Sequence, residues 1–202
     1  MIDHDHWLEA QEEEVSWWGS CANTFHEEEK QMIYAWYMGL QFYEDSQSPY
    51  NIDGNNKMIV DIGGGPSSLL LKVKGAKYRH VLDPCKYPSW VAHRYKETGI
   101  DFRNIAAEDI KVDHYDKMDE VWMYNVLQHT ESPIDIILNG LSILKTGGVF
   151  RIFEWINTPV NEAHPHSLTR EFFDEVFNQR GDTVNLARSG CYGEAYYGEF
   201  KK

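Results

Sequence analysis

The segment IVDIGGGPS places an aspartate, Asp61, two residues before the first of three consecutive glycines, Gly63, Gly64 and Gly65. Glycine has no Cβ, so a glycine turn after an apolar run lets the backbone approach a ligand closely. A carboxylate beside such a turn can accept charge-assisted hydrogen bonds from an ammonium group. A second aspartate, Asp83, ends another apolar run further along the chain. Together these residues indicate a site for a phosphate, a dinucleotide or another nucleoside.

Three kinds of ligand site share this glycine pattern. A phosphate-binding P-loop needs Gly-Lys followed by Ser or Thr, and this turn has no such continuation. A dinucleotide fingerprint needs GxGxxG; Gly63 and Gly65 fit it, but Ser68 replaces the third glycine, which weakens that interpretation without excluding it. The third is a site for a nucleoside joined to methionine, in which Asp61 has the expected place.

The elements that must position these residues alternate from residue 57 onward. Strands are predicted at 58–62, 78–83, 100–105, 119–126, 148–155, 183–190 and 195–202. Helices are predicted at 67–74, 88–99, 132–145 and 167–181, the last capped by Ser167 or Thr169. The alternation is typical of an α/β, doubly wound, mostly parallel sheet, which binds ligands at the carboxyl ends of its strands.

The helix at 132–145 is predicted because its apolar residues recur three and four positions apart. They are Ile134, Ile137, Leu138, Leu141 and Leu144.

Residues 1–55 differ from the rest because tryptophans and tyrosines alternate with acidic runs. A helix is predicted at 27–40, with Ile33, Tyr34, Tyr37 and Met38 near one face. The polar, turn-rich stretch 45–56 is predicted to be a linker. We therefore expect an N-terminal helical cap or lid, 1–55, and a ligand-binding domain, 56–202.

Five segments resemble, in order, the motifs of class I S-adenosylmethionine-dependent methyltransferases, most closely the small-molecule (methyltransferase type 11-like) branch. They are VDIGGGPS, VLDP, NIAAEDI, DEVWMYNVLQHTESP and LSILKTGGVFRIFEW. The resemblance covers roughly residues 57–180. It implies a seven-stranded Rossmann-like sheet and S-adenosylmethionine as cofactor.

The resemblance also implies the residues that bind this cofactor. Asp61 would accept from the methionine ammonium, Asp83 would take both ribose hydroxyls, and Asn125 would lie beside the methionine moiety. Ala107 and Glu108 lie where the family contacts adenine, although Ala106 replaces a frequent aspartate there. The full implied set is Asp61, Gly63, Gly64, Gly65, Asp83, Ala107, Glu108 and Asn125.

His129 and Glu154 are the candidate catalytic residues of the implied methyl transfer to an oxygen or nitrogen of a small molecule. A histidine after the fourth strand can take a proton, because its pKa lies near neutral pH. Glu154 ends the next strand and is its candidate partner. The alternatives are a structural histidine and a helix-capping carboxylate, since alignment of the reactants supplies much of the rate.

Other functions stay open at this stage. A non-catalytic partner subunit with this fold is the main alternative, and a nicotinamide oxidoreductase is a weaker one. The His4/His6 and His164/His166 pairs have metal-ligand spacing, but nothing places them together, so no metal is expected. Trp17, Trp18, Tyr34 and Tyr37 are candidates to cover the cofactor or the acceptor.

Composition limits the partners. The 202 residues hold 19 Lys and Arg against 32 Asp and Glu, a net charge of −13 that disfavours nucleic-acid binding. Three cysteines without a CxxC motif favour a reducing cytoplasm. No signal-peptide pattern or apolar membrane-length run is present, so we expect no membrane association. The oligomeric state is not predicted.

Overall fold

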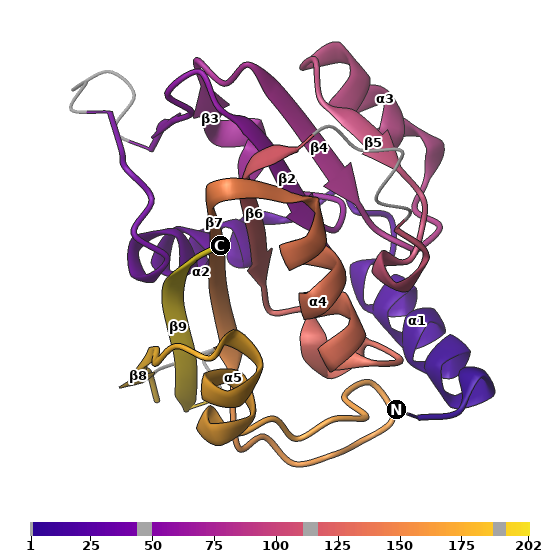
Figure 1. Ribbon diagram of the computed structural model, residues 1–202. Coiled ribbons are helices and arrows are strands. Elements are labelled where there is room, and N and C mark those ends of the chain that lie inside the picture. The colour runs from indigo at the N-terminus through magenta and orange to yellow at the C-terminus, as the bar shows by residue number, and fades with distance from the viewer. Residues whose placement is uncertain (1, 44–49, 111–116, 188–192) are drawn as a thin grey trace.

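A seven-stranded sheet forms the centre of the computed structural model, which describes residues 2–43, 50–110, 117–187 and 193–202 (Figure 1). The strand order is β5-β4-β2-β6-β7-β9-β8. The strands are β2 (Met58–Ile62), β4 (Tyr78–Leu82), β5 (Asp101–Arg103), β6 (Met118–Tyr124), β7 (Leu144–Trp155), β8 (Asp182–Asn185) and β9 (Glu194–Lys201). The first five pair in parallel and β9 pairs antiparallel with both β7 and β8. The predicted doubly wound, mostly parallel sheet is therefore confirmed.

Helices cover both faces of the sheet (Figure 1). α4 (Pro133–Ile143) and α5 (Arg170–Phe177) pack on one face through residues such as Ile137 and Phe173. α2 (Phe25–Tyr37) and α3 (Ser89–Glu97) pack on the other face through Tyr34 and Tyr95. Covering on both faces explains why the central strands are nearly continuous apolar runs. The Thr169 side chain accepts from the backbone N–H of Phe172, which confirms one of the two predicted caps.

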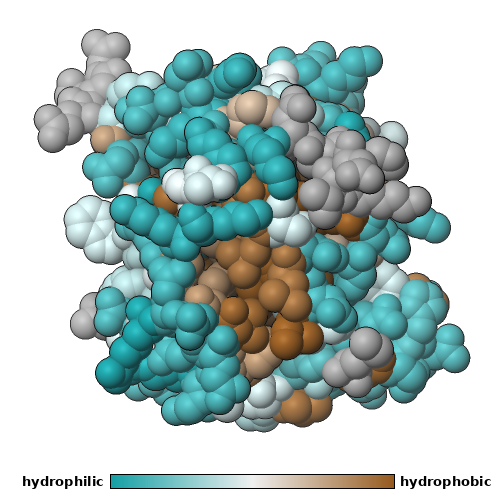
Figure 2. Space-filling view, viewed as in Figure 1, coloured by the Kyte–Doolittle hydropathy of each residue, from teal (hydrophilic) through white to brown (hydrophobic). Residues whose placement is uncertain are grey.

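The buried face of α4 matches the apolar residues of the predicted helix only in part, because Ile137 and Leu144 are buried and Leu141 packs against the core. Ile134 and Leu138 are 46 % and 49 % exposed, whereas Ile136, Ile137, Gly140 and Ile143 are buried. The helix carries apolar residues on two sides, so periodicity alone does not choose between them. The side that contains Gly140 is the buried one. A Cβ at Gly140 would lie 2.6 Å from a ring carbon of Phe150 in β7, so only glycine allows this close packing. The unburied side leaves an apolar patch on the surface over α4 (Figure 2).

The segment after β2 is not the predicted helix over 67–74. A short 3-10 helix, η1 (Leu69–Lys72), is followed directly by β3 (Val73–Lys74). β3 pairs in parallel with β1 (Ile52–Asp53), so part of the predicted linker is a strand; residues 44–49 of that region lie outside the described residues. β-Branched Val73 favours the extended backbone found there. The boundary at residue 55 stays a prediction.

The N-terminal segment forms two helices, α1 (His4–Trp18) and α2. α2 confirms the helix predicted at 27–40, although Ile33 is exposed rather than buried. Glu28 of α2 accepts from Ser67 and Lys72 and so attaches the helix to the segment after the glycines. α1 lies against the turns that follow β4 and β6: Gln11 donates to the His129 carbonyl and accepts from the Cys85 thiol. The N-terminal helices therefore reach the ligand-binding edge of the sheet.

Candidate functional site

The glycine turn follows β2 at the carboxyl edge of the sheet. Gly63 and Gly65 have φ angles of 73° and 62°, in the left-handed region that favours glycine. A Cβ on Gly63 would lie 2.5 Å from the Val126 methyl groups, and one on Gly64 would lie 2.8 Å from Asp61 Oδ2. The turn therefore needs glycine both for its backbone conformation and for its close packing.

Side chains from neighbouring elements hold this turn in place. Asp83 Oδ2 accepts from the Gly65 N–H at 2.8 Å, and Oδ1 accepts from the Cys85 N–H at 2.9 Å. Tyr95 of α3 donates to the Gly65 carbonyl and accepts from the Ser68 N–H, both at 2.8 Å. Burial raises the pKa of Asp83 to about 6, although the two N–H donors oppose that rise. The second aspartate thus supports the turn as well as facing the cavity.

Asp61 is fully buried behind the turn. Its Oδ2 accepts from Ser68 Oγ and from the Tyr124 hydroxyl, each at 2.5 Å. Its Oδ1 has no hydrogen-bond partner among the described residues. Burial raises the pKa of Asp61 to about 7, and the nearby charge of Asp83 adds to the rise. A buried carboxylate oxygen without a donor is an acceptor for a ligand that brings an N–H of its own.

One cavity brings together most of the residues that the sequence identified. Seven of the eight predicted cofactor residues line it; Asp61, the eighth, lies directly under Gly64 and is not part of the lining. The seven are Gly63, Gly64, Gly65, Asp83, Ala107, Glu108 and Asn125. They come from the ends of β2, β4 and β6 and from η2 (Ala107–Asp109).

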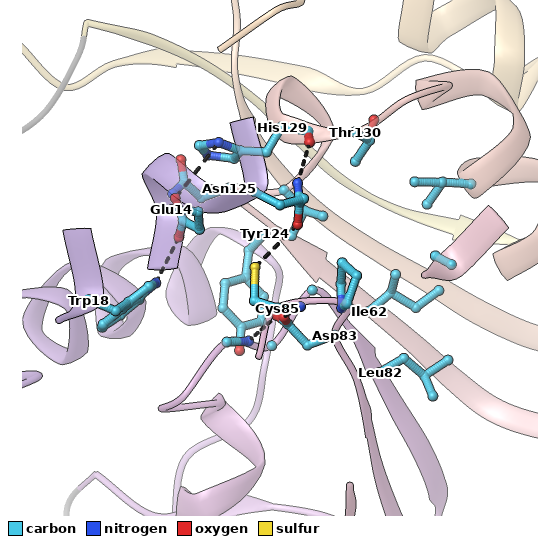
Figure 3. Close-up of a pocket in the computed structure, with 18 of the residues that line it drawn as sticks. Glu14, Trp18, Ile62, Leu82, Asp83, Cys85, Tyr124, Asn125, His129 and Thr130 are labelled. Atoms are coloured by element: carbon cyan, nitrogen blue, oxygen red, sulfur yellow. Dashed lines mark hydrogen bonds and ion pairs between the residues drawn. The ribbon is translucent and has the colours of Figure 1, made fainter. Parts of the chain in front are cut away.

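Of the α1 residues that line this cavity, the sequence identified only Trp18. Four residues of α1 line the cavity at spacings of four, three and four along one side of the helix: Trp7, Gln11, Glu14 and Trp18. Figure 3 shows Glu14 between His129 and Trp18, with a dashed line to each. The spacing was present in the sequence, but two polar residues in the stripe hid it from a search for apolar periodicity.

Glu108 lines the cavity but is also held by α4. Its Oε1 lies 3.2 Å from the Glu131 N–H and 3.5 Å from the Ser132 N–H, at the start of that helix. Asn139 of α4 donates to the Ala107 carbonyl at 3.0 Å. Burial raises the pKa of Glu108 above its usual value. These contacts fix the wall of the cavity where an adenine contact was expected.

His129 ends η4 (Leu127–His129), the short helix after β6, and lines the same cavity. Its Nδ1 lies 2.8 Å from the Ala163 carbonyl, an acceptor only, so Nδ1 carries the hydrogen. Burial lowers the pKa of His129 to about 4, so the imidazole is neutral at pH 7. Its Nε2, which lies 3.4 Å from the Gln128 side-chain nitrogen, is then the basic atom.

Glu154 is fully buried and does not line the cavity. Its carboxylate accepts from the backbone N–H groups of Val126 at 2.9 and 3.1 Å and of Leu127 at 3.2 Å. Burial raises its pKa to about 8. The carboxylate that faces the His129 imidazole is Glu14, whose Oε2 lies 3.8 Å from Nδ1. The structure thus places Glu154 under the η4 backbone and not beside the His129 ring.

A second cavity adjoins the first and shares five residues with it: Glu14, Trp18, Glu27, Asn125 and His129. It adds Glu13, Trp17, Lys30, Gln128, Asn161, Ala163 and His164. Trp17 and Trp18 therefore line cavities, as does Tyr34 in the first one. Tyr37 instead packs against Phe153 and Tyr197.

The two histidine pairs approach each other through His6 and His166, whose charges interact. His164 lines the second cavity, whereas His166 Nε2 lies 2.7 Å from the Thr130 carbonyl. His4 pairs with Glu131 at 3.3 Å. Within the ranges that the structure describes, no group of three or more His, Cys, Asp or Glu residues is arranged to hold a metal ion. Across the same ranges, no helix has both the length and the apolar character that a membrane span requires.

No protein-family model and no curated sequence matches this chain. Solved structures do match. N-methyltransferase NodS from Bradyrhizobium japonicum WM9, in complex with S-adenosyl-L-homocysteine, superposes with a TM-score of 0.68 at 14 % identity, over 98 % of each chain. A second match is the 1,6-didemethyltoxoflavin-N1-methyltransferase of Burkholderia thailandensis with bound 1,6-didemethyltoxoflavin and S-adenosylhomocysteine. It superposes with a TM-score of 0.62 at 13 % identity, over 100 % of this chain and 91 % of that one.

These similarities define the fold. The chain has the Rossmann-like fold of the class I S-adenosylmethionine-dependent methyltransferases, as its motifs predicted. The [4+2]-cyclase SpnF also has it, with a TM-score of 0.54 at 15 % identity, over 77 % of this chain and 58 % of that one. Because one fold serves more than one reaction, the function must be argued from the site.

Proposed function

We propose that this protein is an S-adenosylmethionine-dependent methyltransferase that transfers a methyl group to an oxygen or nitrogen of a small-molecule acceptor. The observation that carries the proposal is the cavity at the carboxyl edge of the sheet, which seven of the eight predicted cofactor residues line, with the Asp61 oxygen that lacks a donor buried under its glycine turn. NodS and the toxoflavin methyltransferase support it, since both share the fold and were solved with the demethylated cofactor.

The residues of the first cavity fit the cofactor in their chemistry. Asp61 offers an acceptor for the methionine ammonium, and the absence of a Cβ at Gly65 leaves room between the turn, Trp18 and Tyr87. Each Asp83 oxygen accepts one backbone N–H and Tyr87 donates a further hydrogen bond to the carboxylate, so only the remaining acceptor capacity is available for the ribose hydroxyls. Ile62, Leu82 and Ile136 supply apolar lining, and Ala107 and Glu108 form the proposed adenine wall.

The bound cofactor supplies an electrophilic methyl group on a sulfonium. The work of the protein is then to align the acceptor and to exclude water, which supplies most of the rate. α1 is the proposed lid over the site, in accord with the proposed cap, because four of its residues line the cavity: Trp7, Gln11, Glu14 and Trp18. His129 lines both cavities, and its neutral Nε2 is the proposed proton acceptor for the attacking group. Glu154 serves by fixing the backbone from which His129 projects.

The acceptor is proposed to be a small molecule and not a nucleic acid, because the net charge of −13 repels phosphate backbones. Cys21 and Cys85 are buried free thiols, which fits the proposed reducing cytoplasm.

Isothermal titration with S-adenosylmethionine, S-adenosylhomocysteine and NAD tests the proposal. We expect saturable binding of the first two and none of NAD. If the first two do not bind, the cofactor assignment is wrong, and the non-catalytic partner subunit becomes the better interpretation. If NAD alone binds, the glycine turn is a dinucleotide site.

A companion variant separates binding from chemistry. His129→Ala should leave the affinity for S-adenosylhomocysteine nearly unchanged but lower methyl transfer, once an acceptor is known. An unchanged rate would remove His129 from the mechanism.

A further inference from the structure

The second cavity has a composition that points to a particular class of ligand. It holds three carboxylates, Glu13, Glu14 and Glu27, and one ammonium, Lys30. Lys30 Nζ lies 2.6 Å from Glu27 Oε1, so this pair is internally neutral. The lining therefore keeps an excess of two negative charges when the carboxylates are ionised.

Glu14 is the carboxylate that both cavities share. Its Oε1 accepts from the indole N–H of Trp18 at 2.7 Å, and its side chain is only 25 % exposed. The two imidazoles beside it do not supply a positive charge, because burial lowers the pKa of both His129 and His164 to about 4. Burial raises the pKa of Glu14 itself, and the charge of Lys30 opposes that rise without donating a hydrogen bond to Glu14. A largely buried carboxylate with only neutral donors is stabilised by a cation from outside.

The remaining residues of the lining suit an organic cation. The indoles of Trp17 and Trp18 belong to the lining, and indole is the aromatic ring that attracts cations most strongly. Asn125, Asn161 and the Ala163 backbone bring amide oxygens that each accept one hydrogen bond within the protein and have a second lone pair for an N–H of the ligand. An anionic acceptor would meet two uncompensated carboxylates in the same space.

We propose that the acceptor held in the second cavity is a basic amine, whose ammonium group lies against the Glu14 carboxylate and beside the tryptophans. This inference rests on the proposed function, and it narrows the acceptor atom from oxygen or nitrogen to nitrogen. The place of Glu14 on the border between the two cavities brings the amine nitrogen to the side where the cofactor is proposed to bind.

The reaction balances without a further reagent. The bound ammonium first gives one proton to the Glu14 carboxylate, which for an amine acceptor takes the role proposed above for His129 Nε2 and passes the proton to bulk water. The amine then has a free electron pair. That pair forms the new N–C bond as the methyl–sulfur bond breaks and its electrons stay on sulfur. The product nitrogen carries the positive charge that the sulfonium loses, so Glu14 keeps a cationic partner after transfer.

Binding of three small probes with the same skeleton tests the inference without any turnover. They are 2-phenylethylamine, 2-phenylethanol and phenylacetate, which are cationic, neutral and anionic at pH 7. Each is titrated into the protein saturated with S-adenosylhomocysteine, and tryptophan fluorescence reports binding. We expect the amine to bind about tenfold more tightly than the alcohol, the effect of one favourable charge contact, and phenylacetate to bind more weakly than both.

Glu14→Gln is the decisive variant, because it removes the charge and keeps the size. We expect it to weaken the amine about tenfold and to leave the alcohol unchanged. Glu12→Gln removes the same charge from an exposed position of the same helix and should change neither. The inference is overturned if the alcohol or phenylacetate binds as tightly as the amine, or if the two variants behave alike.

Two outcomes separate this inference from the proposed function. If S-adenosylhomocysteine binds but the probes show no charge preference, the amine assignment fails and the methyltransferase proposal stands. If Glu14→Gln weakens S-adenosylmethionine much more than S-adenosylhomocysteine, Glu14 faces the sulfonium instead of an amine. If neither cofactor form binds, the proposed function itself fails. The three probes are then titrated into the protein without cofactor, and the same charge preference tests the cavity.

Discussion

The Asp61 carboxylate and the Tyr124 hydroxyl lie 2.5 Å apart, at the ends of the adjacent parallel strands β2 and β6. The Tyr124 oxygen also accepts from the Leu69 N–H at 2.9 Å, so one hydroxyl links the carboxylate to the segment after the glycine turn. Both residues are buried, at 0 % and 4 % exposure. The ionisation of Asp61 is therefore coupled to a residue that the sequence reasoning treated only as part of a strand.

Tyr124→Phe removes the donor and should raise the pKa of Asp61 further above about 7, because that hydrogen bond opposes the effect of burial. The methionine ammonium binds the ionised carboxylate, so affinity for S-adenosylmethionine should fall as the pH drops through the pKa of Asp61. We expect the variant to need a higher pH than the wild type for equal affinity. Titration calorimetry between about pH 6 and about pH 9 measures this shift.

Tyr50→Phe, which removes a hydroxyl from a side chain that is 67 % exposed, is the matched control. It should follow the wild-type pH profile. A wild-type affinity that does not change across this pH range would contradict the assigned role of Asp61.

Asp83→Ala should weaken the binding of S-adenosylhomocysteine by about 1.5–3 kcal/mol, the range for hydrogen bonds to a charged group. The side chain supports the turn at Gly65 as well as facing the cavity, so circular dichroism must first show that the variant is folded. Asp182→Ala removes an exposed aspartate from the edge strand β8 and should bind normally. Normal binding by the Asp83 variant would mean that the second motif is misplaced.

The sheet could be predicted from the sequence because its central strands are apolar runs separated by turns. The glycine turn and Asp83 could be placed because they follow those runs directly. The buried face of α4 could not, since Ile134 and Ile137 are equally apolar and the choice depends on how closely Phe150 approaches Gly140. Such a contact joins residues that are distant in the sequence and leaves no local pattern.

Apart from Trp18, the contribution of α1 was hidden for a different reason. Gln11 and Glu14 are polar, so the stripe that they form with two tryptophans has no apolar periodicity. The prediction that Glu154 partners His129 used only the positions at which their strands end. The orientation of the Glu154 side chain depends on the backbone N–H groups of Val126 and Leu127, which no residue pattern reveals.

Glu154 should make folding stability depend on pH. Burial raises its pKa in the folded protein to about 8, above the ordinary value of 4.5. A raised folded pKa contributes stability that is fully present below the unfolded pKa and is lost as the pH rises through the folded pKa. Urea unfolding of the wild type should therefore show stability falling between about pH 5 and about pH 8 relative to Glu154→Gln, which does not ionise.

Glu162→Gln, in the loop before α5, is the control, because Glu162 is exposed. Its stability should follow that of the wild type over the same pH interval. Equal pH dependence in the wild type and Glu154→Gln would show that Glu154 stays ionised in the fold.

Gly140→Ala tests the close packing of α4 on the sheet. Alanine favours a helix over glycine by about 1 kcal/mol, so propensity alone predicts a more stable protein. The new Cβ would lie 2.6 Å from Phe150 Cε2 and 3.4 Å from Ile62 Cδ1, inside a buried core. Overpacking costs about 1–3 kcal/mol, so we expect a net loss in the free energy of urea unfolding. Ser142→Ala adds no atoms to the same helix and should change stability little. A gain in stability for Gly140→Ala would show that α4 lies further from β7 than the 2.6 Å approach implies.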